Sequence, residues 1–288
     1  MTAVQTRRKR KLGQFLNVLR KRSGKTEADF HALTRKTQSA LSRMENGYIM
    51  PSWTELGALL GLYGATDAER LAAQGMWEDA KQDGTRLVHP AAYTPEARTY
   101  ARQEADAAEV RTVEMTVVPG LLQTPEYATA VRLGAHRFAN PSIALEQIVA
   151  ARQSRQRRLS DDVPLRLHAL IDEAALRRVV GGPEVMRAQL LHVLAMAKRA
   201  NITVQVVPFG AGSYGSMSGG GTFILSFDDE VDLEAVYLEY NGGGKWVDNA
   251  DDVQKFILHF NDMASEVALT PKESAVLVRT LADALKDT

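Results

Sequence analysis

Residues 25–47 constrain the fold of this chain more than any other stretch. They are typical of two short helices joined by a tight turn and closed by Gly47. Side chains on a helix follow one another at about 100°, so Leu41 and Met44 share one side of the second helix. Four polar residues share its other side: Ser39, Ser42, Arg43 and Asn46. One side is expected to pack on a core, while the other is suited to the major groove of DNA.

Helical periodicity and capping residues extend this pattern over the N-terminal quarter of the chain. A helix is predicted from about residue 11 to residue 22, because apolar residues recur there at helical spacing. Phe30 and Leu33 are expected to face inward from the next helix. Four residues suit helix N-caps: Thr26, Thr37, Ser52 and Thr66. The sequence therefore predicts five small helices around one core, ending near residue 82.

The formal net charge of zero conceals a strong asymmetry. Residues 1–60 carry twelve Lys or Arg against four acids, an excess of eight, so the remainder has an excess of eight acids. A basic module joined to an acidic body is expected where only the first part meets a polyanion. The basic run from Arg7 to Lys11 also fits a merely solvated tail.

A polar stretch near residues 81–85 breaks the helical pattern and predicts a linker. The domain boundaries expected are 1–82 for the helical head, 83–94 for the linker and 95–288 for the body. Residues 95–160 are predicted to be mostly helical, interrupted by the apolar segment 117–122.

After Pro164 the periodicity changes to that of strands. Alternation and β-branched content predict strands at 165–171, 203–207, 222–227 and 235–240, with a helix at 185–199. Two amphipathic helices are expected to finish the chain. The fold class predicted is α+β, in which an all-α five-helix domain precedes a helical segment and an α+β C-terminal domain.

The head resembles Cro/CI-type (XRE-type) helix-turn-helix regulators across residues 12–62. Residues at the family's spacing carry the resemblance: Gly24, Thr26, Ser39, Leu41, Ser42, Arg43, Glu45 and Gly47. The resemblance implies that the third helix enters the major groove, with Gln38, Ser39 and Arg43 facing bases. Ser42 belongs to the same face, and Thr37, Asn46 and Tyr48 are expected near phosphates. Arg20 and Glu45 match a pair that forms a structural salt bridge in such proteins.

Three positions depart from the family pattern. Glu27 replaces a glutamine beside the phosphate backbone, where a carboxylate repels DNA yet favours the helix N-terminus. Arg35 and Lys36 replace a glycine and an apolar residue of the turn, and His31 replaces an alanine. Either Arg35 and Lys36 add phosphate contacts in a remodelled turn, or this copy binds DNA weakly. A helical domain used only for protein contact is the further alternative.

The body resembles the uncharacterised, antitoxin-like domain that follows such a head in many actinobacterial regulators. Separated segments across roughly residues 95–285 carry this resemblance: 118–124, 157–159, 172–176, 180–186 and 203–209. Relatives of this kind are often encoded beside a small protein. The resemblance therefore implies a small partner protein without naming a ligand.

Catalytic, metal and cofactor motifs are weak in this sequence, and we expect no enzyme activity, cofactor or metal. The six histidines have no metal-ligand spacing, and the glycine-rich segment 210–221 fits a loop between strands better than a phosphate cradle. Asp172 and Glu173 suit either a general base or an acidic helix cap. Residues 228–234 fit a solvated loop, or a weak cation site.

The expected setting is a cytoplasmic protein without a membrane span. No cysteine occurs, the N-terminus lacks a signal-peptide core, and no apolar run approaches the ~20 residues of a membrane helix. The function predicted is a transcription regulator that binds double-stranded DNA as a homodimer and receives a signal through its body. An adaptor that holds a small partner protein and an enzyme acting on a small molecule are the alternatives.

Overall fold

The computed structural model describes residues 7–81, 87–134, 143–216, 219–228, 234–240, 243–247 and 249–286. The chain divides into two compact units, Met1–Arg86 and Leu87–Thr288. Of the expected linker, residues 83–86 lie outside the described residues, whereas residues 87–94 belong to the second unit. There Leu87 is buried and the Tyr93 hydroxyl donates to the carbonyl oxygen of Ala151 over 3.0 Å.

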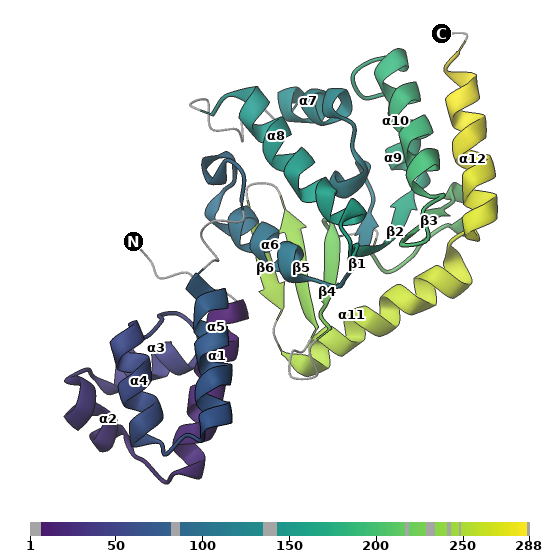
Figure 1. Ribbon diagram of the computed structural model, residues 1–288. Helices are drawn as coiled ribbons and strands as arrows, with labels where there is room; N and C mark the ends of the chain where they lie inside the picture. Colours follow the sequence, from purple (N-terminus) through teal and green to yellow (C-terminus); the bar gives the residue numbers. More distant parts are fainter. Residues whose placement is uncertain are drawn as a thin grey trace. The chain divides into compact units, whose positions relative to one another are not determined.

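The first unit is built from helices (Figure 1). Its described helices are α1 (Arg7–Arg22), α2 (Glu27–Thr34), α3 (Gln38–Glu45), α4 (Trp53–Leu62) and α5 (Asp67–Lys81). The side chains of Thr26, Thr37 and Ser52 accept hydrogen bonds from backbone N–H groups in the first turns of α2, α3 and α4. These caps fix where each helix begins, because they satisfy N–H groups that have no partner within the helix.

A single apolar core joins these helices. Buried residues from every helix meet in it, including Leu16, Phe30, Met44, Leu59 and Ala73. The expectation that Leu33 faces inward was wrong, because its side chain is 42% exposed. Helix α2 has only two full turns and a single buried residue, Phe30, which already occupies its core-facing side.

The second unit combines a sheet with helices. Its strands are β1 (Glu109–Glu114), β2 (Arg166–Asp172), β3 (Ile202–Val207), β4 (Thr222–Ser226), β5 (Ala235–Tyr240) and β6 (Gly243–Val247). Its α-helices are α6 (Pro95–Asp106), α7 (Pro125–Gly134), α8 (Leu145–Gln156), α9 (Glu173–Arg177), α10 (Pro183–Met196), α11 (Ala250–Asp262) and α12 (Pro271–Ala284). The fold class is therefore α+β, as the sequence predicted.

The six strands form one mixed sheet in the order β3-β2-β1-β4-β5-β6. Strands β1, β2 and β3 are parallel, whereas β4, β5 and β6 continue the sheet as antiparallel neighbours. Strand β1 lies at the junction, with Val113 opposite Leu170 on one side and Thr222 on the other.

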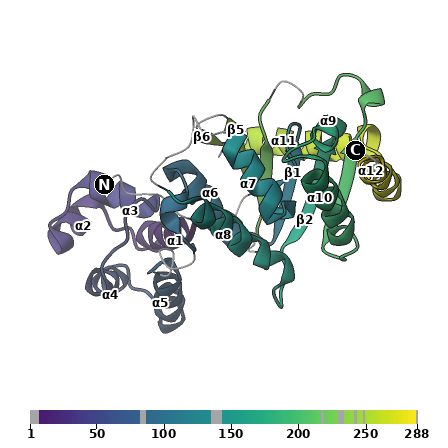
Figure 2. The same ribbon diagram turned by 90° about the horizontal axis from the view of Figure 1, so that it is seen from above.

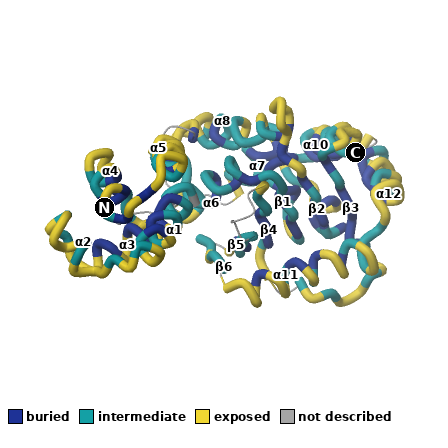
Figure 3. Tube along the Cα trace, turned by 60° about the horizontal axis from the view of Figure 1, so that its bottom comes forward, coloured by how far each residue is buried: buried dark blue, intermediate teal, exposed yellow. Residues whose placement is uncertain are grey.

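Helices cover both faces of this sheet (Figures 2 and 3). One face carries side chains such as Leu167, Val204 and Leu225, which pack under α6, α7, α8, α10 and α12. On the other face, residues such as Leu170 and Ile224 pack against Ile257 of α11 and its neighbours. Because side chains alternate along each strand, the two faces of the sheet contribute to two separate apolar cores.

Two strands and one short helix differ from the sequence prediction. Residues 109–114 were expected in a helical region, yet they form β1 in the middle of the sheet. The sequence of β1 carries three charged residues, and its charged side chain Arg111 is accommodated by an ion pair with Glu234. The glycine-rich edge strand β6 and the helix α9 were likewise not predicted. Glycine favours neither strand nor helix, so β6 forms through its pairing with β5.

Candidate nucleic-acid interface

Helix α3 has one buried side and one exposed side. Ala40, Leu41, Met44 and Glu45 are buried in the unit. The polar residues expected to contact DNA are exposed: Thr37, Gln38, Ser39, Ser42, Arg43, Asn46 and Tyr48. The exposed face thus presents amide, hydroxyl and guanidinium groups, which are the groups that read base edges and phosphates.

The turn before α3 has an unusual backbone conformation. Arg35 adopts φ 59° and ψ 16°, in the left-handed region where glycine is favoured. Its N–H donates to the carbonyl oxygen of His31 over 2.8 Å, and the Lys36 N–H donates to Thr34 Oγ1 over 3.2 Å. Arg35 therefore adopts a turn conformation that is typical of glycine and places a cation on the turn.

A buried ion pair holds α3 against α1. Arg20 Nε lies 2.6 Å from Glu45 Oε1, and Arg20 Nη2 donates to Glu45 Oε2 over 3.0 Å. Asn17 Nδ2 donates to the same carboxylate over 2.9 Å. The hydrogen bond to Glu45 raises the pKa of Arg20, against the effect of burial. The pair sets the angle of α3 from its inner side, so it supports the exposed face without belonging to it.

Two glycines allow α1 and the end of α3 to approach closely. A Cβ at Gly13 would lie 2.3 Å from the carbonyl oxygen of Met44, and one at Gly47 would lie 2.4 Å from the backbone nitrogen of Arg10. Gly47 also has φ +73°, so it ends α3 in a conformation that other residues rarely adopt. Larger residues at either position would displace α3.

Several candidate contact residues have partners within the unit. Gln38 Nε2 donates to Glu27 Oε1 over 2.9 Å, and Arg43 Nε donates to the Ser39 carbonyl oxygen over 3.3 Å. Asn46 Nδ2 donates to the Ser42 carbonyl oxygen over 2.8 Å. These bonds restrain exposed side chains, and the bond of Arg43 to Ser39 uses only its Nε and neither Nη atom.

Lys36 is engaged by α4. Its Nζ lies 2.5 Å from Glu55 Oε1, and the Lys36 side chain remains 38% exposed. The hydrogen bond from Lys36 is the main reason that the pKa of Glu55 is lowered. Glu55 also forms the capping box of α4 with Ser52. The sequence does not predict this ion pair, since Lys36 lies in the turn before α3 and Glu55 lies on α4. A phosphate contact by Lys36 would have to compete with Glu55.

Comparisons with known protein families match both units. Residues 97–280 match the family described as "Domain of unknown function (DUF5753)", which covers more than half of the chain. The chain belongs to the DUF5753 family. Residues 11–73 match a helix-turn-helix domain, the region that contains α3 and its turn. No curated protein and no solved structure gives a significant match.

The acids singled out in the DUF5753 region serve the structure. Asp172 Oδ1 accepts from the Ala174 N–H over 2.7 Å as the N-cap of α9, and its Oδ2 accepts from the Tyr214 hydroxyl. Glu173 lies 2.6 Å from Arg177 Nε and accepts from the Phe209 N–H over 2.7 Å. Both carboxylates are occupied by protein donors, which favours the helix-cap interpretation over a general base. Residues 229–233 of the expected acidic loop lie outside the described residues.

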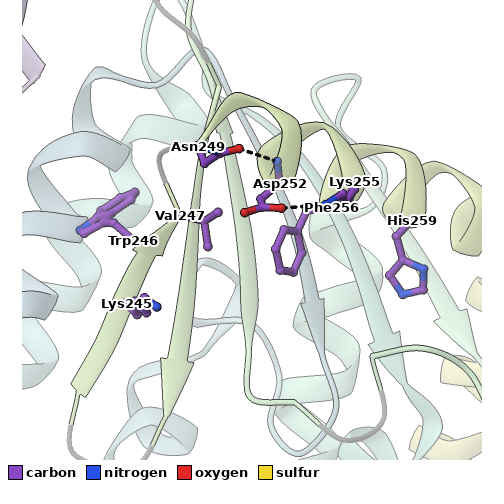
Figure 4. Close-up of a pocket in the computed structure, with 8 residues that line it drawn as sticks. All are labelled: Lys245, Trp246, Val247, Asn249, Asp252, Lys255, Phe256 and His259. Carbon is purple, nitrogen blue, oxygen red and sulfur yellow. Dashed lines mark hydrogen bonds and ion pairs between the residues drawn. The ribbon is translucent and has the colours of Figure 1, made fainter.

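A pocket of about 480 Å³ lies between β6 and the start of α11 in the DUF5753 region (Figure 4). Asn249 caps α11 by accepting from the N–H groups of Asp251 and Asp252, and Lys255 Nζ lies 2.8 Å from Asp252 Oδ1. Phe256 and His259 line the same pocket. The polar side chains of Asn249, Asp252 and Lys255 in this pocket thus already have partners in or beside α11.

The structure also bears on the metal and membrane expectations. Among the described residues, no cluster of three or more His, Cys, Asp or Glu side chains has the geometry to hold a metal ion. His168 Nε2 instead lies 2.7 Å from Gln205 Oε1, and burial lowers its pKa. Within the same described part of the chain, no helix is both long and apolar enough to cross a bilayer.

Proposed function

We propose that this chain is a cytoplasmic transcription regulator of the XRE type that reads operator DNA with α3. The observation that carries the proposal is the exposed polar face of α3 within a matched helix-turn-helix domain. The excess of eight positive charges over residues 1–60 supplies the electrostatic attraction to phosphates that DNA binding requires.

Individual roles follow from position on the exposed face. Arg43 contacts a guanine edge and Gln38 an adenine edge, with Ser39 and Ser42 beside them. Thr37, Asn46 and Tyr48 contact phosphates, as do Arg35 and Lys36 from the turn. Arg20 and Glu45 keep α3 at its angle, and contact no DNA.

A homodimer is part of this proposal. One α3 of eight residues contacts few base pairs, and helix-turn-helix proteins gain affinity by placing two such helices one helical turn of DNA apart. The second unit, including residues 95–288, would then provide self-association and control. We also propose that a small partner protein binds this unit, because the unit is acidic and is not expected to contact DNA.

The apolar spacing of Phe256, Phe260, Leu281 and Leu285 in the C-terminal helical region fits either an interface or an internal core. Phe260 and Leu281 are buried inside the second unit, and Phe256 and Leu285 pack partly buried against its cores. These residues therefore stabilise the fold of the second unit.

Mapping the genomic binding sites of the intact protein tests the proposed function. We expect discrete palindromic sites, and Arg43→Ala should lose ~1–3 kcal/mol on the preferred site and flatten the preference at one base position. Asp262→Asn on the second unit serves as a matched exposed control. Uniform genomic binding by the wild-type chain, or an unchanged base preference in Arg43→Ala, would contradict the proposal.

A further inference from the structure

A second, larger cavity of about 700 Å³ lies on the face of the sheet covered by α6 and α8. The rings of Tyr100, Phe223 and Tyr237 form part of its wall. The ring centroid of Tyr100 lies 5.1 Å from that of Phe223 and 4.9 Å from that of Tyr237, so the three rings form one cluster. The volume falls within the range of small-molecule sites, and the rings offer an apolar surface to a ligand.

Positive side chains outnumber negative ones in the wall of this cavity. The charged residues that line it are four arginines and two glutamates: Arg98, Arg132, Arg152, Arg155, Glu114 and Glu239. Charges that are partly withdrawn from water act more strongly than charges on an open surface. The wall therefore favours an anionic occupant.

Two arginines on α8 differ in their partners. Arg155 directs Nε and Nη2 to the two oxygens of Glu104, each over 2.6 Å, so its charge is balanced by a carboxylate. Arg152, one turn earlier, donates from Nη1 to Gln123 Oε1. The amide of Gln123 is oriented by its own Nε2, which donates to the Val118 carbonyl oxygen over 2.6 Å. Arg152 is therefore held in place by a neutral group that does not balance its charge.

The other donors of Arg152 have no acceptor in the described part of the chain. Its Nε and Nη2 make no hydrogen bond there, and no carboxylate lies within ion-pair distance of the guanidinium. Burial and the charge of Arg155 lower the pKa of Arg152, yet a guanidinium stays protonated near neutral pH. A guanidinium withdrawn from water normally pairs with an anion. The side chain of Arg152 thus lacks an anionic partner inside the cavity.

A row of three residues lies across β1, β4 and β5 in the same cavity. The register of β1 and β4 places Glu114 beside Gly221, whose carbonyl oxygen accepts from the Glu239 N–H over 2.8 Å. A Cβ at Gly221 would lie 3.1 Å from Glu114 Oε2 and 3.1 Å from Phe223 Cε2. The glycine therefore leaves space beside the carboxyl group and the ring.

Glu114 does not supply the missing anion for Arg152. The residue is only 6% exposed, and its carboxyl group makes no hydrogen bond or ion pair with the described residues. Burial and the charge of Glu239 raise the pKa of Glu114 to about 8, against the opposing effect of Arg152. The carboxyl group is therefore mainly protonated at pH 7, and it can donate a hydrogen bond to an anion beside it.

We propose that this cavity binds a small organic carboxylate with an aromatic body, and that the carboxylate pairs with Nε and Nη2 of Arg152. The planar guanidinium matches the two oxygens of a carboxylate. The protonated Glu114 donates to the same carboxylate, and the rings of Tyr100, Phe223 and Tyr237 pack against the aromatic body. A singly charged group suits the site better than a phosphate, because the glutamates oppose a larger negative charge.

Three indole compounds test the charge requirement on the intact protein. Indole-3-propionate, tryptophol and tryptamine carry a carboxylate, a hydroxyl group and an ammonium group on the same ring and linker. Calorimetry on wild type is expected to give indole-3-propionate the tightest binding. This comparison needs no substitution, so it is decisive even where a variant fails to fold. Absence of indole-3-propionate binding, or equal or tighter binding of tryptophol or tryptamine, would overturn the proposal.

Variants of Arg152 connect the charge requirement with the proposed contact. Arg152→Gln should weaken indole-3-propionate binding about tenfold and change tryptophol binding little, so that the preference for the acid is lost. Arg152→Lys keeps the charge without the planar fork and should fall between the two. Arg199→Gln, at an exposed arginine after α10, should bind as wild type does. A preference for the acid that is unchanged in Arg152→Gln would exclude the contact.

The pH dependence of binding tests the place of the carboxylate. The charged groups that face Glu114 are Glu239 and Arg152, and its ionisation adds a negative charge beside the bound ligand. Indole-3-propionate binding to wild type should therefore weaken as pH rises through about 8, and Glu114→Gln should lose this step. Glu266→Gln, at an exposed acid on the π-helical turn after α11, should follow wild type. A wild-type affinity that stays constant through this range would overturn the placement beside Glu114.

These measurements involve no DNA, so their outcome is independent of the proposed regulator function.

Discussion

The side-chain amide of Gln38 donates to Glu27 Oε1 over 2.9 Å and joins the first turn of α3 to the first turn of α2. The acid that departs from the helix-turn-helix pattern therefore has a partner on the exposed face of α3. It restrains Gln38 while it places negative charge where phosphates are expected. These two effects oppose each other in DNA binding.

We expect Glu27→Gln to tighten DNA binding and to lower the melting temperature slightly. The amide keeps an acceptor for Gln38 but removes the carboxylate that repels phosphates and favours the helix N-terminus. Glu27→Ala removes the acceptor as well and isolates the contribution of the Gln38 bond. Fluorescence anisotropy on operator DNA measures the effect; weaker binding by the glutamine variant would mean that α2 does not approach the backbone.

Lys36→Ala should weaken binding to all DNA sequences and reduce the salt dependence of the association constant. One lost phosphate contact lowers the slope of log K against log salt by up to about 0.9. Glu55→Gln is the informative counterpart, because it releases the Lys36 ammonium group from its ion pair and should tighten non-specific binding. A slope in Lys36→Ala equal to that of wild type would exclude the phosphate contact.

Arg35→Gly should stabilise the first unit while weakening its DNA binding. Arg35 has φ 59°, which costs a residue with a side chain up to ~1–2 kcal/mol relative to glycine, and the greater freedom of glycine in the unfolded chain offsets part of the gain. Arg35→Ala retains the strain and loses only the cation. Both variants should therefore lose the same DNA affinity, whereas chemical denaturation should report higher stability for the glycine variant alone. Equal stabilities would show that the turn is not strained.

The sequence predicted those parts of the fold that local chemistry determines. Thr26, Thr37 and Ser52 cap the helices that their positions indicated, because capping involves neighbours within three residues. The pairing of Lys36 with Glu55 was not predicted, because only tertiary packing brings the turn before α3 beside α4. Strand β1 was missed for a related reason: the partner of its charged residue Arg111 is Glu234, which lies far along the chain just before β5.

The cavity of about 700 Å³ under α6 and α8 could not be predicted from the sequence either. Glu114 is separated from Gly221 and Glu239 by more than a hundred residues along the chain, and only the strand order β1-β4-β5 places the three in one row. None of the three belongs to a recognisable motif. Their relation depends on strand register, which a hydrophobic pattern in isolated segments does not define.

The pH dependence of stability should reveal the buried state of Glu114. Its pKa rises from an ordinary 4.5 to about 8, mainly through burial and secondarily through the charge of Glu239. The folded chain holds this proton more tightly than the unfolded chain, so the associated stability is complete below about pH 4.5 and disappears as pH rises through about 8. Glu114→Gln cannot titrate at this position. Its melting temperature should therefore gain on that of wild type between pH 5 and pH 9, with Glu266→Gln as the exposed control. A difference between wild type and Glu114→Gln that stays constant over this range would mean that Glu114 remains ionised in the folded protein.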